Sequence, residues 1–217
     1  MGRSPRGQDA YKYMKLGPKF KIARRLGSPI FEKTQTQKYQ LSLSKKEESG
    51  KRFRRARSEY ARQHNEKQKV RLTYGVTEKQ FHNYVNKALG VKSEVGKPAE
   101  LYQLLESRLD NAIYRLGLAP TRRAARQIVS HGHITVNDRK VNVPSLTLYE
   151  GDILGIRKGS ETAGVFSGLV EKLKDRTIPS WLSFSLETRV GKVSGKPAFD
   201  QTSLELDFPS VFEFYSR

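Results

Sequence analysis

The residues best suited to chemistry in this chain are closely spaced arginines. Arg122, Arg123 and Arg126 lie in the segment TRRAARQIVSH, and helical periodicity places their side chains on one side of a helix. The apolar residues of the same segment fall roughly opposite. A guanidinium group offers a planar fork of donors that matches phosphate or stacks on a base. The pattern predicts a helix with one face that packs and one cationic face that binds phosphate.

Groups that would support catalysis are scarce. The sequence has no phosphate-cradling glycine loop, no dinucleotide-binding glycine pattern and no GxSxG nucleophile elbow. Asp110 and Asn111 resemble an acid site, but we interpret them as a polar corner that fixes a turn or pairs with Arg108 or Arg115. We therefore predict a protein that is not an enzyme.

A metal site or a bound cofactor is not predicted either. The chain has no cysteine, which excludes a disulfide framework and a cysteine-ligated zinc or iron–sulfur site. His131 and His133 are two residues apart and could face the same way on a strand. They lie beside the arginine-rich helix, however, and contact with RNA or plain exposure is the favoured interpretation.

The charge of the chain points to a polyanionic partner. The formal net charge of the 217 residues is +19, and the first hundred residues hold 25 Lys and Arg against 9 Asp and Glu. No apolar stretch approaches the length of a membrane span, and no strongly amphipathic basic helix suggests membrane binding. Zinc-finger and basic-zipper patterns are absent, which favours structured RNA over DNA.

The elements of the first 98 residues are predicted to form a basic helical domain. Pro18 opens a short helix and Gly27 ends it, and Thr77 with Gln80 forms a capping box. The predicted order is a helix over 19–26, a loop over 28–50, a basic run over 51–57, a polar helix over 58–72, a helix over 77–89 and a linker over 91–98.

The following residues predict an α+β fold. An apolar stripe from Leu101 to Leu116 predicts one helix, and Thr121 is a plausible N-cap for the arginine-rich helix. Alternating residues about Asn137-Asp138 predict a β-hairpin. The remaining expectations are a strand at ILGIR, a short helix at SGLVEKLKD, a strand over 182–186, a turn-rich stretch over 191–204 and a packed aromatic C-terminus. Two helices would thus pack on a small, mainly antiparallel sheet.

Residues 108–158 strongly resemble the RNA-binding module named after the S-four protein of the small ribosomal subunit. That module also occurs in pseudouridine synthases and other proteins, so the flanking blocks decide the family. They are LGPKFKIARRLG at 16–27, EKQKVRLTYGVTEKQFHNYVNKA at 66–88, IPSWL at 178–182 and the terminal FEFYSR. The chain is identified as a member of the bacterial-type small-subunit ribosomal protein S-four family. Many members carry four zinc-binding cysteines near the N-terminus, so this chain is a zinc-free form.

The resemblance implies a structural constituent of the 30S subunit. Such a protein binds the 5′ domain of 16S rRNA at a helix junction and nucleates assembly of the subunit body. It lies beside the S-five protein, contributes to translational accuracy, and lies near the channel through which mRNA enters. Some members also bind their own mRNA. The implied location is the cytoplasm, in the ribosome, and an N-terminal extension leaves an organellar ribosome open.

The resemblance also implies domain boundaries and contact residues. A helical domain over 1–98 would be joined by the C-terminal tail 208–217, and an α+β domain over 99–207 would contain the module. The residues expected to contact rRNA are Lys19, Lys21, Arg24, Arg25, Arg52, Arg54, Arg55, Arg57, Lys67, Lys69, Arg71, Tyr74, Arg108, Asn111, Arg115, Thr121, Arg122, Arg123, Arg126, Ser130 and His131. Arg52, Arg54, Arg55 and Arg57 would lie near the mRNA.

Two other functions use the same module. An RNA-modifying enzyme would need a catalytic domain with an aspartate nucleophile, and the roughly sixty residues after the module are too few for one. A free regulator or RNA chaperone would not need the complete set of ribosomal blocks. Both alternatives therefore rank below the ribosomal interpretation.

Overall fold

The computed structural model describes residues 16–48, 58–92, 95–160, 164–166, 177–185, 188–200 and 205–216. The chain forms two compact units, Met1–Lys51 and Arg52–Arg217, which we describe separately. The expected mRNA-proximal arginines Arg52, Arg54, Arg55 and Arg57 and the helix expected at SGLVEKLKD lie outside the described residues.

The first unit contains α1 (Lys19–Leu26), the 3-10 turn η1 (Glu32–Thr34) and α2 (Gln37–Glu48). The predicted helix over 19–26 is confirmed, and Gly27 ends it with a φ of +74°. The predicted loop over 28–50 is wrong, because α2 lies within it. Tyr39 is the only buried side chain among the described side chains of α2, and it packs against Phe20 at 5.2 Å between ring centroids. One buried ring makes no periodic stripe, so the sequence pattern missed this helix.

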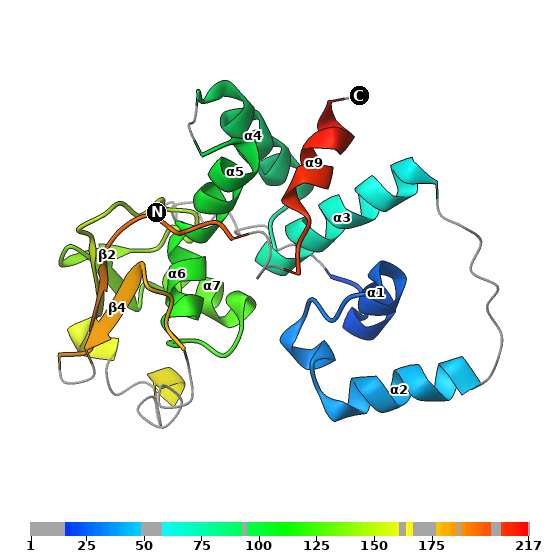
Figure 1. Cartoon of the computed structure of the whole chain (residues 1–217). Helices are drawn as coiled ribbons and strands as arrows, with labels where there is room; N and C mark the ends of the chain where they lie inside the picture. Colours follow the sequence, from blue (N-terminus) through cyan, green and yellow to red (C-terminus); the bar gives the residue numbers. More distant parts are fainter. Residues whose placement is uncertain are drawn as a thin grey trace, which may run out of the picture. The chain divides into compact units, whose positions relative to one another are not determined.

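The second unit begins with a core built by helices. Its members are α3 (Glu59–Tyr74), α4 (Glu78–Gly90), α5 (Lys97–Glu106) and the C-terminal α9 (Phe208–Tyr215). The predicted capping box is confirmed, since Thr77 Oγ1 accepts from the Gln80 amide and the Gln80 side chain accepts from the Thr77 amide. The last helix packs against α3 and α5, and its Phe208 is fully buried (Figure 1). The C-terminal aromatic residues therefore serve this core.

The predicted single helix across residues 101–116 is wrong. The chain forms α5 and then a separate α6 (Leu109–Arg115), with Arg108 in an extended conformation between them. Backbone hydrogen bonds from Leu109 to Leu146 and from Leu148 to Ser107 hold the break. The apolar stripe is consequently divided: its first leucines enter the helical core, and those from Leu109 onward enter a second core.

The second core lies between two helices and a sheet. Helices α6 and α7 (Arg122–Ser130) accompany an antiparallel sheet of five strands in the order β2-β1-β3-β5-β4 (Figure 1). The strands are β1 (Ile134–Val136), β2 (Arg139–Val141), β3 (Ile153–Ile156), β4 (Leu182–Ser185) and β5 (Val190–Val193). The predicted hairpin is confirmed, with Asn137 and Asp138 at positive φ in its turn. The α+β fold class is confirmed as well.

One strand lies where a turn-rich stretch was predicted. β5 overlaps the beginning of 191–204 and pairs with both β3 and β4. Gly191, which suggested a turn, is buried in the sheet instead, and an added Cβ atom there would lie 2.8 Å from Leu116 Cδ1. Glycine at this position permits the close approach of α6 to the sheet. The 3-10 turns η2 (Lys158–Ser160) and η3 (Gly164–Phe166) follow β3.

Candidate nucleic-acid interface

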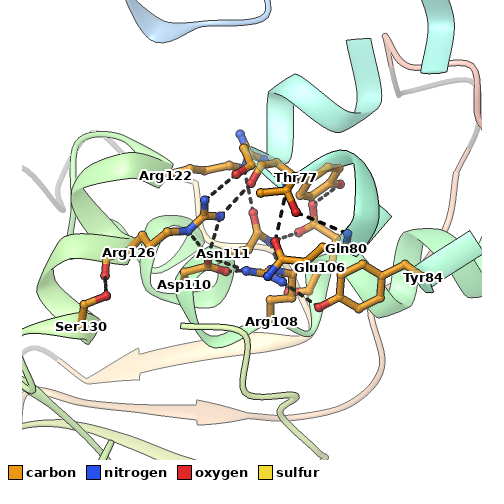
Figure 2. A network of polar contacts seen from close by, with 12 residues as sticks. Thr77, Gln80, Tyr84, Glu106, Arg108, Asp110, Asn111, Arg122, Arg126 and Ser130 are labelled. Carbon is orange, nitrogen blue, oxygen red and sulfur yellow. Dashed lines mark hydrogen bonds and ion pairs between the residues drawn. The ribbon is translucent and has the colours of Figure 1, made fainter. Parts of the chain in front are cut away.

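A buried carboxylate joins the helical core to the module. Glu106, at the end of α5, is fully buried and accepts four side-chain hydrogen bonds (Figure 2). Arg115 donates from Nε and Nη2 at 2.8 and 2.7 Å, Asn111 Nδ2 donates at 2.8 Å, and Tyr74 Oη donates at 2.7 Å. Asn111 and Arg115 lie in α6 and Tyr74 lies in α3, so one carboxylate holds α3, α5 and α6 together. A buried charge persists only with such complete partners.

A second buried carboxylate, Asp110, lies at the start of α6. It accepts from Arg108 Nε and Nη2 at 3.0 and 2.8 Å and from Arg126 Nε at 2.8 Å. Arg126 also donates to the carbonyl oxygens of Tyr74 and Gly75, which end α3 (Figure 2). The arginine of α7 thus satisfies backbone acceptors left open at a helix C-terminus. The predicted polar corner at Asp110 and Asn111 is confirmed, with Arg108 as one partner.

Arg122 completes this polar network. Its Nε donates to Asn111 Oδ1 at 2.8 Å, and its guanidinium carbon lies 4.5 Å from the ring centroid of Tyr114 and 5.0 Å from that of Tyr74. The interaction of a guanidinium with two aromatic rings is favourable in itself. The sequence pattern predicts one free cationic face on α7. That prediction is wrong for Arg122 and Arg126, which face inward and have partners.

The network sets the charge states of its members. Burial alone would raise the pKa of the Glu106 carboxyl, but the hydrogen bonds and charge of Arg115 outweigh burial and hold it below its ordinary value. Burial and the neighbouring Glu106 raise the pKa of Tyr74 well above its ordinary value. Glu106 is therefore an anion and Tyr74 a neutral donor at neutral pH.

Arg123 is the arginine of α7 that points outward. This side chain is exposed and has no hydrogen bond or ion pair within the described part of the chain. It lies in the first turn of α7, where the helix dipole is positive and no acidic residue is present. A cation there is electrostatically unfavourable for the helix alone, whereas a phosphate would be favoured. Thr121 caps this helix by accepting from the Ala124 amide at 3.1 Å.

The other predicted contact residues of the module lie near the far end of α7. Ser130 Oγ donates to the Arg126 carbonyl oxygen at 2.8 Å, so it is used within the helix. His131 is exposed, and its ring lies 6.0 Å from that of His133. At this end of α7, His131 is therefore available to a ligand, whereas the Ser130 hydroxyl is used within the helix.

The predicted contact residues of α3 are largely paired inside the protein. Lys67 is buried, donates to Glu78 Oε1 at 2.6 Å and lies 4.3 Å from the Phe214 ring centroid. Lys69 donates to Glu66 at 2.6 Å, and Arg71 forms an ion pair with Glu78 at 3.1 Å. The block EKQKVR therefore contributes to the fold of α3, α4 and α9 through its cations.

The cations of α1 are more accessible. Lys21 and Arg25 are exposed, whereas Lys19 and Arg24 are half-buried. Lys19 Nζ lies 5.5 Å from the Phe31 ring centroid, and Arg24 Nε donates to the Phe20 carbonyl oxygen at 3.2 Å. Lys21 and Arg25 are the residues of this helix that present charge outward.

The sequence reasoning missed several residues of the network. The predicted helix over 101–116 includes Glu106, and the position of this acidic residue between two groups of leucines is the one sequence signal of its burial. Tyr84 was also missed, and its hydroxyl accepts from Arg108 Nη1 at 2.7 Å. Within the described ranges, no group of three or more His, Cys, Asp or Glu side chains could hold a metal ion. No helix of those ranges is long and apolar enough to cross a membrane.

Comparisons with known proteins agree with this arrangement. The family model of the ribosomal protein S4/S9 N-terminal domain matches residues 14–106, and that of the S4 domain matches residues 107–154. The junction of the two matches falls between Glu106 and Ser107, at the break between α5 and α6.

Whole-length relatives point the same way. The small ribosomal subunit protein uS4 of Amoebophilus asiaticus is 39% identical over 206 residues, which cover 93% of this chain and 98% of the relative. The proteins of the same name from Halothermothrix orenii and Christiangramia forsetii are each 40% identical, over 206 and 202 residues, with the same coverage. The chain therefore belongs to the family of the small ribosomal subunit protein uS4.

Proposed function

We propose that this protein is a structural constituent of the small ribosomal subunit and binds 16S rRNA directly. The observation that carries the proposal is the similarity to uS4 proteins across 98% of their length, which includes both the helical part and the module. A targeting module on an unrelated enzyme would share only the second part. Membership in this family agrees with the prediction that the chain is not an enzyme.

The physical features of the second unit support an RNA partner. Arg123 lies at the N-terminus of α7 and has no ion pair with any residue that the structure describes, and His131 is exposed at the other end of the same helix. Phosphate groups of a structured RNA match both features. Arg108 is buried, and Arg115, Arg122 and Arg126 each donate to partners inside the protein, so they rank below Arg123 as proposed rRNA contacts. We assign these four residues to positioning the module against the helical core.

The contacts and partners remain proposals at finer detail. We propose rRNA contacts for Lys21, Arg25 and Arg123, and mRNA contacts for the arginines over 52–57. The 5′ domain of 16S rRNA is the proposed binding region, at a helix junction where the protein nucleates assembly of the subunit body. The S-five protein is the proposed neighbour in translational accuracy, and the protein's own mRNA is a further proposed ligand. The rigid link between the two cores suits a protein that must fix RNA segments relative to one another.

Sedimentation tests this proposal. An extract containing the epitope-tagged chain is separated on a sucrose gradient at a magnesium concentration that keeps the subunits apart. The tagged chain is expected to comigrate with 30S particles and to stay there after a wash in moderate salt. A chain found only in the light fractions would overturn the proposal and favour a free regulator or RNA chaperone.

A further inference from the structure

A cluster of basic groups lies where α7, β2 and the end of β3 meet. His131 and His133 flank Gly132 at the turn from α7 into β1, and Lys140 comes from β2. Arg157 follows β3, and its backbone amide donates to the His133 carbonyl oxygen at 2.9 Å. The cluster thus gathers two imidazoles, one ammonium and one guanidinium from three separate segments.

Lys140 is held close to the histidine turn. Gly132 has a φ of +71°, and an added Cβ atom would lie 2.3 Å from Lys140 Cε and 3.3 Å from its Nζ. The positive φ favours glycine at this position, and without a Cβ atom the lysine side chain can lie over the turn. Lys140 is exposed, and neither it nor the Arg157 guanidinium has an ion pair in the part of the chain that the structure describes.

His133 is oriented by its other neighbours. Its Nδ1 forms a hydrogen bond with Ser160 Oγ at 2.9 Å, and the Phe166 ring meets it edge-on at 6.3 Å between centroids. Its Nε2 has no hydrogen-bond partner among the described residues. Burial, together with the positive charges of His131, Arg157 and Lys140, lowers the pKa of His133 below its ordinary value, and no carboxylate opposes them. A site with cations and no anion is incomplete without a negatively charged ligand.

We infer that His133, Lys140 and Arg157 form a binding site for one phosphate group of the bound RNA, and that protonation of His133 strengthens the binding. The inference rests on the proposed rRNA-binding function and adds that the RNA affinity depends on pH. A phosphodiester keeps its single negative charge between pH 5.5 and 8, so the titrating partner is the imidazole. In the free protein burial and the surrounding cations lower the pKa of His133, which favours its neutral form. A bound phosphate cancels that repulsion and favours the proton, so binding takes up a proton and tightens as the pH falls.

The size of the effect follows from the shift on binding. If the phosphate raises the pKa of His133 by about one unit, the protonated protein binds about tenfold more tightly than the neutral one. The salt dependence provides an independent measure. Losing one phosphate contact should reduce the slope of log affinity against log salt by about 0.7 to 0.9.

The first experiment measures binding of the full chain to a 16S 5′-domain transcript from pH 5.5 to 8.0 at constant ionic strength. Wild type should bind more tightly at the low end, and the gain approaches about tenfold only where the pH lies below both the free and the bound pKa of His133. Compared in a His131→Gln background, so that the exposed His131 cannot contribute, His133→Gln should lose that pH dependence while keeping the affinity measured at pH 8, because glutamine matches neutral histidine in charge. His82→Gln is the matched control, since His82 is exposed on α4 beside Tyr215, and it should behave like wild type. A pH dependence that survives in His133→Gln overturns the inference.

The second experiment uses NMR titration of the histidine side chains of the full chain. Lys140→Met should raise the pKa of His133 in the free protein, because it removes a repelling charge without disturbing a buried residue. Added sulfate, which keeps its charge throughout this range, should raise the pKa of His133 and leave the NMR signals of the His82 ring in place. A sulfate-linked shift without pH-dependent RNA binding would mean that the site takes a free oxyanion, which contradicts an RNA phosphate as the ligand. No shift in either titration would contradict the site itself.

The two proposals fail in distinguishable ways. If wild type shows no preference for the 5′-domain transcript over an unrelated structured RNA at any pH, the rRNA-binding function fails. If the preference is present but the pH dependence of wild type and His133→Gln is the same, only the phosphate site fails.

Discussion

Replacing Glu106 by glutamine tests whether one buried carboxylate holds the two cores of the second unit together. The substitution keeps the size of the side chain and removes its charge. Tyr74 and Arg115 Nη2 donate to Oε1, and Asn111 and Arg115 Nε donate to Oε2. Glutamine has one acceptor oxygen, so it keeps one of these pairs of donors and turns its amide group toward the other pair. The perturbation therefore removes the charge of the ion pair between α5 and α6 and two of the four hydrogen bonds that the carboxylate accepts.

The expected cost follows from burial. Removing one partner of a buried ion pair costs about 3 to 5 kcal/mol of unfolding free energy. Because Glu106 is fully buried but 30% of the Arg115 side chain is exposed, the arginine left behind can reach water, and the lower end of about 3 kcal/mol applies. Glu150→Gln, at an exposed turn residue, should change the unfolding free energy by less than about 0.5 kcal/mol.

Urea denaturation followed by two signals measures this cost. Trp181, the single tryptophan, is buried in the core between the module helices and the sheet, and circular dichroism reports mostly on the helices. Both signals should show the loss of about 3 kcal/mol, since Glu106 contacts both cores. If Glu106→Gln were as stable as Glu150→Gln, the assigned role of Glu106 would be refuted.

The pH dependence gives a second check on Glu106. The folded pKa of Glu106 lies below its ordinary value of 4.5, so the ion pair stabilises the fold above that pH. The stabilisation is lost as the pH falls through the folded pKa. The difference between wild type and Glu106→Gln should therefore be full at pH 7 and shrink below about pH 4. A difference that grows on acidification would contradict the reasoning.

Two further predictions concern the module. Arg123→Glu should leave the unfolding free energy within about 0.5 kcal/mol of wild type, because Arg123 is exposed without an internal partner in the described ranges. Filter binding should show a weaker RNA affinity and a slope of log affinity against log salt reduced by about 0.7 to 0.9. An unchanged affinity would exclude an RNA contact at Arg123. Gly191→Ala should cost about 1 to 3 kcal/mol by crowding Leu116 in thermal or urea unfolding, whereas a neutral result would mean that α6 can shift.

Much of the fold could be predicted from local signals. Pro18, the Thr77 capping box, the Thr121 N-cap and the Asn137-Asp138 turn each act within a few residues, and all four mark elements that the structure contains. The errors arose where distant segments decide the conformation. The break at Arg108 depends on pairing with residues near 146, which no helical period reveals. The predicted boundaries at residues 98 and 207 stay predictions.

The site was harder to predict than the fold. Sequence periodicity placed Arg122 and Arg126 with Arg123 on one side of α7, but it could not show that a second helix supplies Asp110 and Asn111 to that side. A cation that already has partners inside the protein has fewer donors left for a ligand. Tertiary contacts alone show which cations have such partners, and they leave Arg123 as the outward arginine of the helix.

Filter binding at several salt concentrations tests the central proposal most directly. The full chain is titrated against a 16S 5′-domain transcript and against an unrelated structured RNA of equal length. A primary rRNA-binding protein should prefer the 5′-domain transcript, and the preference should persist as salt weakens both complexes. Equal affinity for the two RNAs, falling equally steeply with salt, would show that net charge alone drives binding and would contradict the proposed function.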